Sequence, residues 1–172
     1  MRALLALVLA LIPTAALAHT GHGDTSGFVH GFMHPVGGFD HLLAMVAVGI
    51  LAFAMGGRAL ILVPASFVLM MIGGFALGAS GIGLPWLETG IAASGVVILL
   101  AVLLRRRLPA AVAMALVGTF GVFHGVAHGL EMPATASGLD YALGFVTATA
   151  LLHLGGIAAA LIAARTAKAL AR

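Results

Sequence analysis

Residues 59–79 read ALILVPASFVLMMIGGFALGA, a run without a single charged side chain. A helix of about 20 apolar residues spans the roughly 30 Å hydrocarbon core of a bilayer, so this run predicts a transmembrane helix. The chain as a whole agrees, because its 172 residues are 62% hydrophobic and only 8% charged. That composition excludes a water-soluble globular protein, and we expect a membrane protein.

Similar apolar segments recur on both sides of this run, separated by short loops. They cover residues 39–57, 87–104, 109–130 and 139–164. Together the segments predict an all-α, polytopic bundle of five transmembrane helices, forming a single membrane domain over residues 19–172. Residues 28–38 are also apolar but contain Pro35, Gly37 and Gly38, which favours a half-helix or re-entrant segment. If that segment crosses the membrane, the number of spans becomes six.

Residues 1–18 have the three parts of a secretory signal peptide. Arg2 supplies the basic start, an apolar run to Ile12 follows, and a small-residue stretch ends at Ala18. Cleavage there would make His19 the mature N-terminus. The alternative is an uncleaved first membrane helix, for which the apolar run is short.

The charged residues predict the orientation of the chain. Basic residues follow the first, third and fifth segments: Arg58, Arg105, Arg106, Arg107, Arg165, Lys168 and Arg172. The acidic residues are expected toward the opposite side: Asp24, Asp40, Glu88, Glu131 and Asp140. The positive-inside rule then places the C-terminus in the cytoplasm and the N-terminus in the periplasm of a bacterial inner membrane. The basic residues form no patch interleaved with aromatic side chains, so nucleic acid is not expected as a partner.

The chain has no cysteine, which excludes disulfides, thiolate metal sites and cysteine nucleophiles. A metal site must therefore use imidazole, carboxylate, thioether or backbone ligands. Met33, Met45 and Met132 lie nearest the histidines described below, and such thioethers more often pack than ligate.

Two stretches carry histidines beside carboxylates. The first, HPVGGFDH at residues 34–41, places His34, Asp40 and His41 around a Pro-Gly-Gly break. In the second, HGVAHGLE, His124, His128 and Glu131 have i, i+4 and i+7 spacing and so share one helical face. Neutral imidazole suits Ni²⁺, Co²⁺, Zn²⁺ and Cu²⁺, and ionisable groups at membrane depth are usually functional. The alternatives are a helix-breaking cap and hydrogen-bonded core histidines.

The other histidines are weaker candidates. His153 stands alone in the last segment, where it either continues a metal path or hydrogen-bonds to a neighbouring helix. An entry site is also conceivable, formed by the N-terminal histidines His19, His22 and His30. Near the start of the last segment, Tyr141 and Asp140 are expected to be an interfacial anchor and a helix cap.

Small residues predict close helix contacts. Gly118, Gly121, Gly125 and Gly129 form one stripe on the fourth segment, about 100° from the histidine face. Gly74 and Gly78 repeat this pattern on the second segment, and Gly144 with Ala148 does so on the fifth.

The two histidine stretches resemble the motifs of a known family. HPVGGFDHLLAM (residues 34–45) is similar to the HPxxGxDH motif of the HupE/UreJ nickel and cobalt permeases, and FHGVAHGLE (residues 123–131) is similar to their second histidine motif. The resemblance covers essentially the full chain. It implies that the metal is handled by His34, Asp40, His41, His124, His128 and Glu131, with His153 carried over from less distinctive surroundings. It also implies hydrogenase or urease maturation proteins as partners.

We therefore expect a secondary transporter and not an enzyme, with Ni²⁺ as first cargo, Co²⁺ as second, and no tightly bound cofactor. No G-x-x-x-x-G-K-[ST] motif is present to power an ATP-driven pump. One alternative is an intramembrane redox protein that holds haem between His124 and His153. Another is a membrane metalloenzyme, although no H-E-x-x-H or G-x-S-x-G string occurs. The sequence does not determine the oligomeric state.

Overall fold

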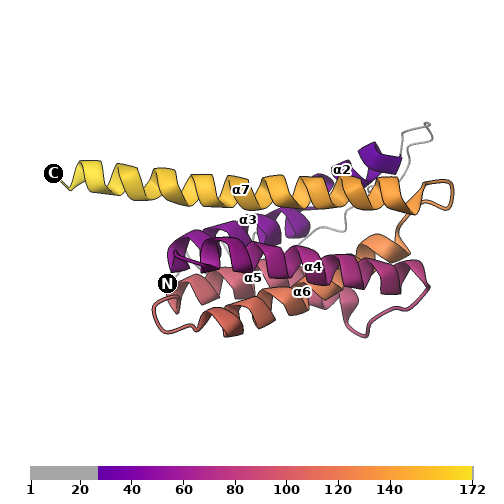
Figure 1. The fold of residues 1–172 in the computed structure, drawn as a ribbon, viewed down its shortest axis with the longest axis horizontal. Helices are drawn as coiled ribbons and strands as arrows, with labels where there is room; N and C mark the ends of the chain where they lie inside the picture. The colour runs from indigo at the N-terminus through magenta and orange to yellow at the C-terminus, as the bar shows by residue number, and fades with distance from the viewer. Residues whose placement is uncertain (1–26, 172) are drawn as a thin grey trace, which may run out of the picture.

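The computed structural model describes residues 27–171, and these form six α-helices without a strand (Figure 1). The helices are α2 (Gly27–Gly37), α3 (Phe39–Met55), α4 (Ala59–Ala79), α5 (Leu87–Leu103), α6 (Ala110–Leu130) and α7 (Gly138–Leu170). The five predicted segments correspond to α3 through α7, except that α7 continues beyond the expected end at residue 164. The predicted signal peptide, His19 and His22 lie outside the described residues.

Three of these helices are long and apolar enough to cross a membrane, namely α4, α6 and α7. Helices α2 and α3 satisfy the same criterion only as a pair, and they meet at an angle of 82°. Helix α5 is apolar but has only 17 residues. The described residues thus provide three candidate spans, or four with the bent pair, and the prediction of five spans is not confirmed.

The bend between α2 and α3 occurs at Gly38. This residue has φ −98° and ψ 122°, which is extended backbone and therefore interrupts the helix. Helix α2 has 11 residues, with Pro35 inside it, and so measures about 16 Å, half of the hydrocarbon thickness. Residues 28–38 thus lie almost wholly in one short helix that ends at the expected break, and their place in a membrane stays a prediction.

Helices α4 and α6 pack closely through the glycines expected to do so. A Cβ added to Gly125 would overlap the carbonyl oxygen of Met71, and one added to Gly78 would overlap that of Val126. Gly121 and Gly129 meet the α4 backbone in the same way. The glycine face of α6 packs against α4. Its histidine face, about 100° round the helix, therefore points toward other helices of the bundle.

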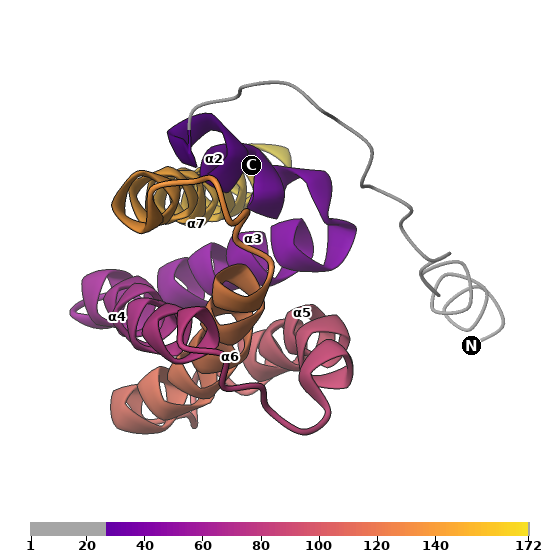
Figure 2. The same cartoon turned by 90° about the vertical axis from the view of Figure 1, so that its right-hand side faces the viewer.

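Helix α7 also packs along α2 and α3 through close contacts at glycines. Gly144 faces the backbone of Phe28 on α2, and Gly156 faces that of Val46 on α3. Viewed from the end, α2 and α7 lie on one side of α3, with α4, α5 and α6 on the other (Figure 2). Helix α3 contacts each of the other five described helices and so connects the two sides.

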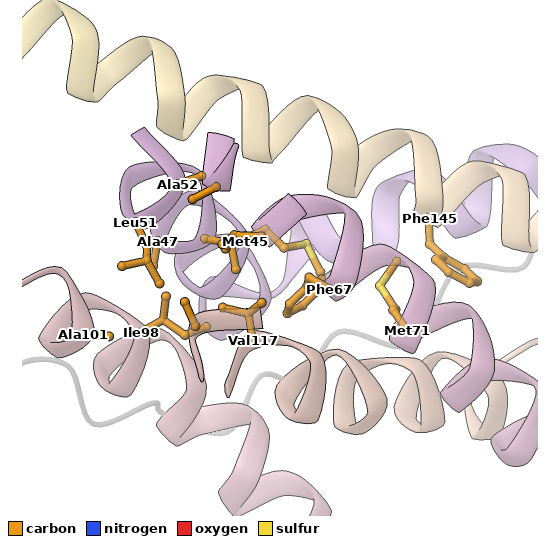
Figure 3. Packing of buried hydrophobic residues seen from close by; sticks show 14 of the residues in the cluster. Met45, Ala47, Leu51, Ala52, Phe67, Met71, Ile98, Ala101, Val117 and Phe145 are labelled. Carbon is orange, nitrogen blue, oxygen red and sulfur yellow. The ribbon is translucent and has the colours of Figure 1, made fainter. Parts of the chain in front are cut away.

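The apolar core surrounds α3. Leu51 on α3, Phe67 on α4, Ile98 on α5, Val117 on α6 and Phe145 on α7 are all fully buried, and Figure 3 shows them between the helices. Packing in this core holds α3 in place, so that its first turn lies close to α6.

The two ends of the bundle differ in charge. The α3–α4 loop, the α5–α6 loop and the C-terminal end of α7 lie at one end (Figure 1), and they carry Arg58, Arg105 to Arg107, Arg165 and Lys168. The other end carries Glu88, Glu131 and Asp140, while Asp40 lies at the bend between α2 and α3. The predicted separation of charge is thus present in the described residues.

Candidate metal centre

Four histidines from the two sequence motifs lie together inside the bundle. Ring centroids are 4.7 Å apart for His34 and His128, and 4.6 Å apart for His41 and His124. His41 also lies 5.3 Å from His34 and 5.5 Å from His128. We call these side chains the four-histidine cluster. Three helices supply it, since His34 is on α2, His41 on α3 and the other two on α6.

The local backbone explains how the cluster forms. The bend at Gly38 places Asp40 and His41 in the first turn of α3, facing the end of α2. A Cβ on Gly38 would lie 3.0 Å from Asp40 Oδ1 and 3.3 Å from His41 Nδ1, so a larger residue would press on this pair. On α6, the i, i+4 spacing places His124 and His128 one above the other.

Two imidazole–carboxylate pairs flank the cluster, one within the first motif and one that joins the two motifs. Asp40 Oδ1 lies 3.1 Å from His41 Nδ1 and accepts a hydrogen bond from the His41 backbone N–H at 2.8 Å. Glu131 Oε2 lies 3.2 Å from His34 Nε2. A carboxylate that accepts from one ring nitrogen leaves the other nitrogen with its lone pair, as in many metal-ligating histidines. In His41 that other nitrogen, Nε2, is buried and has no hydrogen-bond partner.

Burial increases from the carboxylates inward. The side chains of Glu131 and Asp40 are 42% and 35% exposed, whereas those of His34 and His41 are 13% and 10% exposed. His124 and His128 are fully buried. The cluster therefore has an acidic, solvent-accessible edge and a neutral interior, an order that suits a hydrated cation entering from that edge.

Ser94 supports His124, and the sequence analysis did not identify it. Ser94 Oγ donates to the Ile91 carbonyl oxygen at 2.6 Å and lies 3.0 Å from His124 Nε2. Since the single hydroxyl proton is engaged, Oγ accepts a hydrogen bond from Nε2–H, and the lone pair of His124 is on Nδ1. That Nδ1 is buried without a partner. A serine in an apolar segment is a weak signal, and only its contact with α6 reveals its role.

Unpartnered buried nitrogens concentrate in this region. Within residues 27–171, the buried side-chain polar atoms without a hydrogen-bond partner are His41 Nε2, His124 Nδ1, both ring nitrogens of His128, Tyr141 OH and His153 Nε2. Burying such groups is costly, and four of these atoms belong to the four-histidine cluster. Imidazole nitrogens suit borderline transition-metal cations, so a bound cation could satisfy one nitrogen of each ring.

The side chains of the cluster do not point their nitrogen and oxygen atoms at one common position. In the described part of the chain, no group of three or more histidine, aspartate or glutamate side chains meets the geometry of a metal site. The rings contact one another through their faces and edges, with interplanar angles of 58° to 89°. Binding an ion therefore requires the imidazoles to rotate until one nitrogen of each ligand ring faces it.

An aromatic wall closes the cluster toward α7. The ring of Phe145 stacks on His128 with centroids 4.5 Å apart, and Tyr141 lies 6.3 Å from the same histidine. Tyr141 is fully buried, so the expectation that it is an interfacial anchor is wrong. The cap of α7 is Ser137, whose hydroxyl accepts from the Asp140 backbone N–H, so the expectation that Asp140 is the cap is also wrong.

The remaining predicted residues are not members of the four-histidine cluster, although His30 precedes His34 by only one turn of α2. His30 contacts Tyr141, with ring centroids 6.2 Å apart. His153 is buried and contacts Phe67, whose ring lies 5.3 Å from His153 and 5.6 Å from His124. His124 and His153 therefore do not face each other across an open space, which disfavours a haem held between them. Glu88 and Asp140 are exposed at the acidic end.

Comparison with known proteins agrees with the two motifs. Residues 6–172 match the family model described as HupE / UreJ protein. The chain is also 44% identical over 147 residues to the protein named "Protein HupE" of Rhizobium leguminosarum bv. viciae, an alignment that covers 85% of this chain and 76% of that protein. No solved structure matches. The chain belongs to the HupE / UreJ family.

Proposed function

We propose that this protein is a secondary transporter that imports Ni²⁺, with Co²⁺ as its second cargo. The two histidine motifs are about 80 residues apart in the sequence, yet they meet in one buried cluster with a half-exposed carboxylate from each motif. This observation carries the proposal. Family membership supports the same function, because the family is associated with nickel and cobalt supply to hydrogenase and urease.

The arrangement favours a stepwise loss of water from the ion. Glu131 and Asp40 first attract the hydrated cation at the open edge. The imidazoles of His34, His41 and His128 then replace its water ligands as it moves inward. The two carboxylates balance the charge of a dication, which neutral imidazoles alone would leave uncompensated in a poorly polar interior.

The separation of charge supports an inward direction of transport. We propose that α3 through α7 cross a bacterial inner membrane, with the basic end in the cytoplasm and the mature N-terminus, after signal cleavage, in the periplasm. Glu131 is then at the periplasmic side. The membrane potential contributes about 4.6 kcal/mol per 100 mV for a dication that crosses the full field, enough for accumulation of about three orders of magnitude.

We propose no catalysed reaction for this chain, because the metal ion is the cargo that it transports. Delivery to hydrogenase or urease maturation proteins is the use that family membership supports. A metalloenzyme would need a position for substrate beside the ion, whereas the walls of this cluster are the apolar rings of Phe67 and Phe145.

The test is uptake of radiolabelled Ni²⁺ by cells that lack their own nickel importers. The parent chain, Asp40→Ala and His128→Ala are compared at equal expression, with Co²⁺, Zn²⁺ and Cu²⁺ as competitors. Glu88→Ala is the matched control, because Glu88 is an exposed carboxylate at the same end but outside the cluster. We expect uptake by the parent and the control and none by the cluster variants. A parent that imports neither nickel nor cobalt would refute the transporter proposal.

A further inference from the structure

One histidine lies between the acidic end of the bundle and the four-histidine cluster. Helix α2 begins at that end, since a Cβ on Gly27 would lie 3.3 Å from both the Asp140 Cβ and the Ser137 carbonyl oxygen, at the start of α7. His30 is in the first turn of α2, and His34 follows it by one turn. An ion that approaches the cluster along α2 therefore meets His30 before His34.

His30 and His34 share one side of α2. Their i, i+4 spacing places them about 40° apart around the helix axis, with Cβ atoms about 5 to 6 Å apart. Two histidines with this spacing on one helical face bind zinc in helical metal sites, and imidazole also suits Ni²⁺ and Co²⁺. The pair can therefore hold a dication through two nitrogen atoms while water fills its other positions.

Ring contacts place His30 at the border of the cluster. The Tyr141 ring lies 6.2 Å from the His30 ring and 6.3 Å from the His128 ring. His34 contacts the same His128, with ring centroids 4.7 Å apart. Both histidines of α2 thus connect to His128, His34 directly and His30 across Tyr141. An ion held by the pair would lie beside the cluster.

Tyr141 adds a polar group at this border. The residue is fully buried, and within residues 27–171 its hydroxyl group has no hydrogen-bond partner. A buried hydroxyl normally has a partner, because leaving it without one is costly. An ion that keeps part of its water shell beside His30 would supply one, since a water ligand can donate a hydrogen bond to the hydroxyl oxygen.

Two carboxylates lie near the pair. Glu131 Oε2 is 3.2 Å from His34 Nε2, and the side chain of Glu131 is 42% exposed. Asp140, at the start of α7, is exposed as well. The field of these carboxylates concentrates cations where the pair is located. The pair offers fewer imidazoles than the cluster, so it holds the ion more loosely and can release it inward.

From these contacts we propose that His30 and His34 form an outer capture site for partly hydrated Ni²⁺ or Co²⁺, on the path from the acidic end to the four-histidine cluster. The inference rests on the proposed transport function and adds the step that precedes the cluster. His34 belongs to both sites. The ion enters the cluster by exchanging His30 for His128, which contacts His34, while His34 remains its ligand.

The concentration dependence of Ni²⁺ uptake tests the capture step. Cells without their own nickel importers express the parent or His30→Ala at equal levels, and initial rates are measured over a range of radiolabelled Ni²⁺ concentrations. His30→Ala should raise KM at least about fivefold and leave Vmax unchanged, because capture is weakened while the cluster stays intact. An unchanged KM, or a lower Vmax at unchanged KM, would overturn the inference.

Two further substitutions separate metal binding from packing. Met33→Ala is the matched control and should match the parent, since Met33 is 54% exposed on the same helix. His30→Gln keeps a side chain that donates and accepts hydrogen bonds but is a poor ligand, so it should raise KM as alanine does. A parent-like KM for His30→Gln would assign His30 a hydrogen-bonding role and refute the capture site.

Equilibrium dialysis of the purified full chain against Ni²⁺ measures the pair directly. The reference chain carries His124→Ala and His128→Ala, which remove the imidazoles of α6, together with His19→Ala and His22→Ala, which remove the other histidines near the N-terminus. Adding His30→Ala should weaken the remaining Ni²⁺ binding by at least about tenfold, because the chelating pair loses one of its two ligands. Equal affinity of the two chains would contradict the site.

The two proposals can fail separately. If the parent imports no metal but His30→Ala weakens binding, the transport proposal fails while the pair stands as a metal-binding site. If the parent imports nickel and His30→Ala changes neither KM nor affinity, only the capture site fails.

Discussion

Ser94 Oγ lies 3.0 Å from His124 Nε2 while its proton is donated to the Ile91 carbonyl oxygen at 2.6 Å. The serine therefore fixes the ring so that Nδ1 carries the lone pair. Under the proposed function it would act on the metal through His124, as the outer partners of metal-ligating histidines do, and loss of such a partner costs about 10- to 100-fold in metal affinity.

Ser94→Ala should weaken Ni²⁺ binding by about 10- to 100-fold, because His124 loses the acceptor that fixes its tautomer. Equilibrium dialysis of the purified chain against Ni²⁺ measures this change. Ser94→Thr keeps the hydroxyl and should retain most of the affinity. Equal weakening by both substitutions would indicate that packing at α5, and not the hydrogen bond, is responsible.

Asp40→Asn should weaken Ni²⁺ binding and slow uptake by about tenfold or more, an effect of about 1.4 kcal/mol. The amide oxygen still accepts from the His41 backbone, but the charge that balances the cation is lost. Binding titrations and uptake are compared with those of Asp140→Asn, which removes an exposed charge at the acidic end. If the two variants behaved alike, the effect would come from the overall field and not from the cluster.

Lowering the pH should weaken Ni²⁺ binding. Imidazole binds metal only in its neutral form, so each ligand histidine that takes up a proton competes with the ion. Affinity should therefore fall as the pH decreases from about 8 toward 5, the range in which histidine changes charge. Calorimetric titrations at several pH values give the number of protons displaced. An affinity that did not change with pH over this range would show that no ligand of the ion takes up a proton there.

The neighbouring glycines of α4 should respond oppositely to alanine. A Cβ on Gly74 would overlap the backbone of Val122, whereas one on Gly73 would meet no atom within 4 Å. Gly74→Ala should therefore force α4 and α6 apart and lower stability by about 1 to 3 kcal/mol. Gly73→Ala should be neutral or stabilising by up to about 1 kcal/mol, because alanine favours helix. Thermal unfolding in detergent measures both, and equal melting temperatures would contradict the close contact.

The helices and the histidine motifs could be predicted because they depend on local pattern. The apolar runs predicted α3 through α6 to within two residues at each end and α7 except for its last six residues, and i, i+4 spacing placed His124 and His128 on one face. The 82° bend followed the Pro-Gly-Gly break, although its angle depends on how α2 packs against α7.

Contacts between distant segments could not be predicted from local pattern. Ser94, Phe67 and Tyr141 are single residues in apolar runs, and their relation to the histidines appears only when the helices pack. The contact between His153 and Phe67 could not be predicted either, because the sequence position of His153 does not show which side chain of α4 lies beside it.

The four-histidine cluster joins two parts of the bundle that are otherwise packed separately. Helix α2 is held mainly along α7, and α6 mainly along α4, yet His34 of α2 meets His128 of α6. An ion bound there is a removable cross-link between these helix pairs. Ligand present at 100 times its dissociation constant stabilises the folded state by about 2.7 kcal/mol, so arrival of the cargo would stiffen the bundle and its departure would loosen it. Under the proposed function, the ion would thus regulate, through its own binding, how freely the helices of its carrier move.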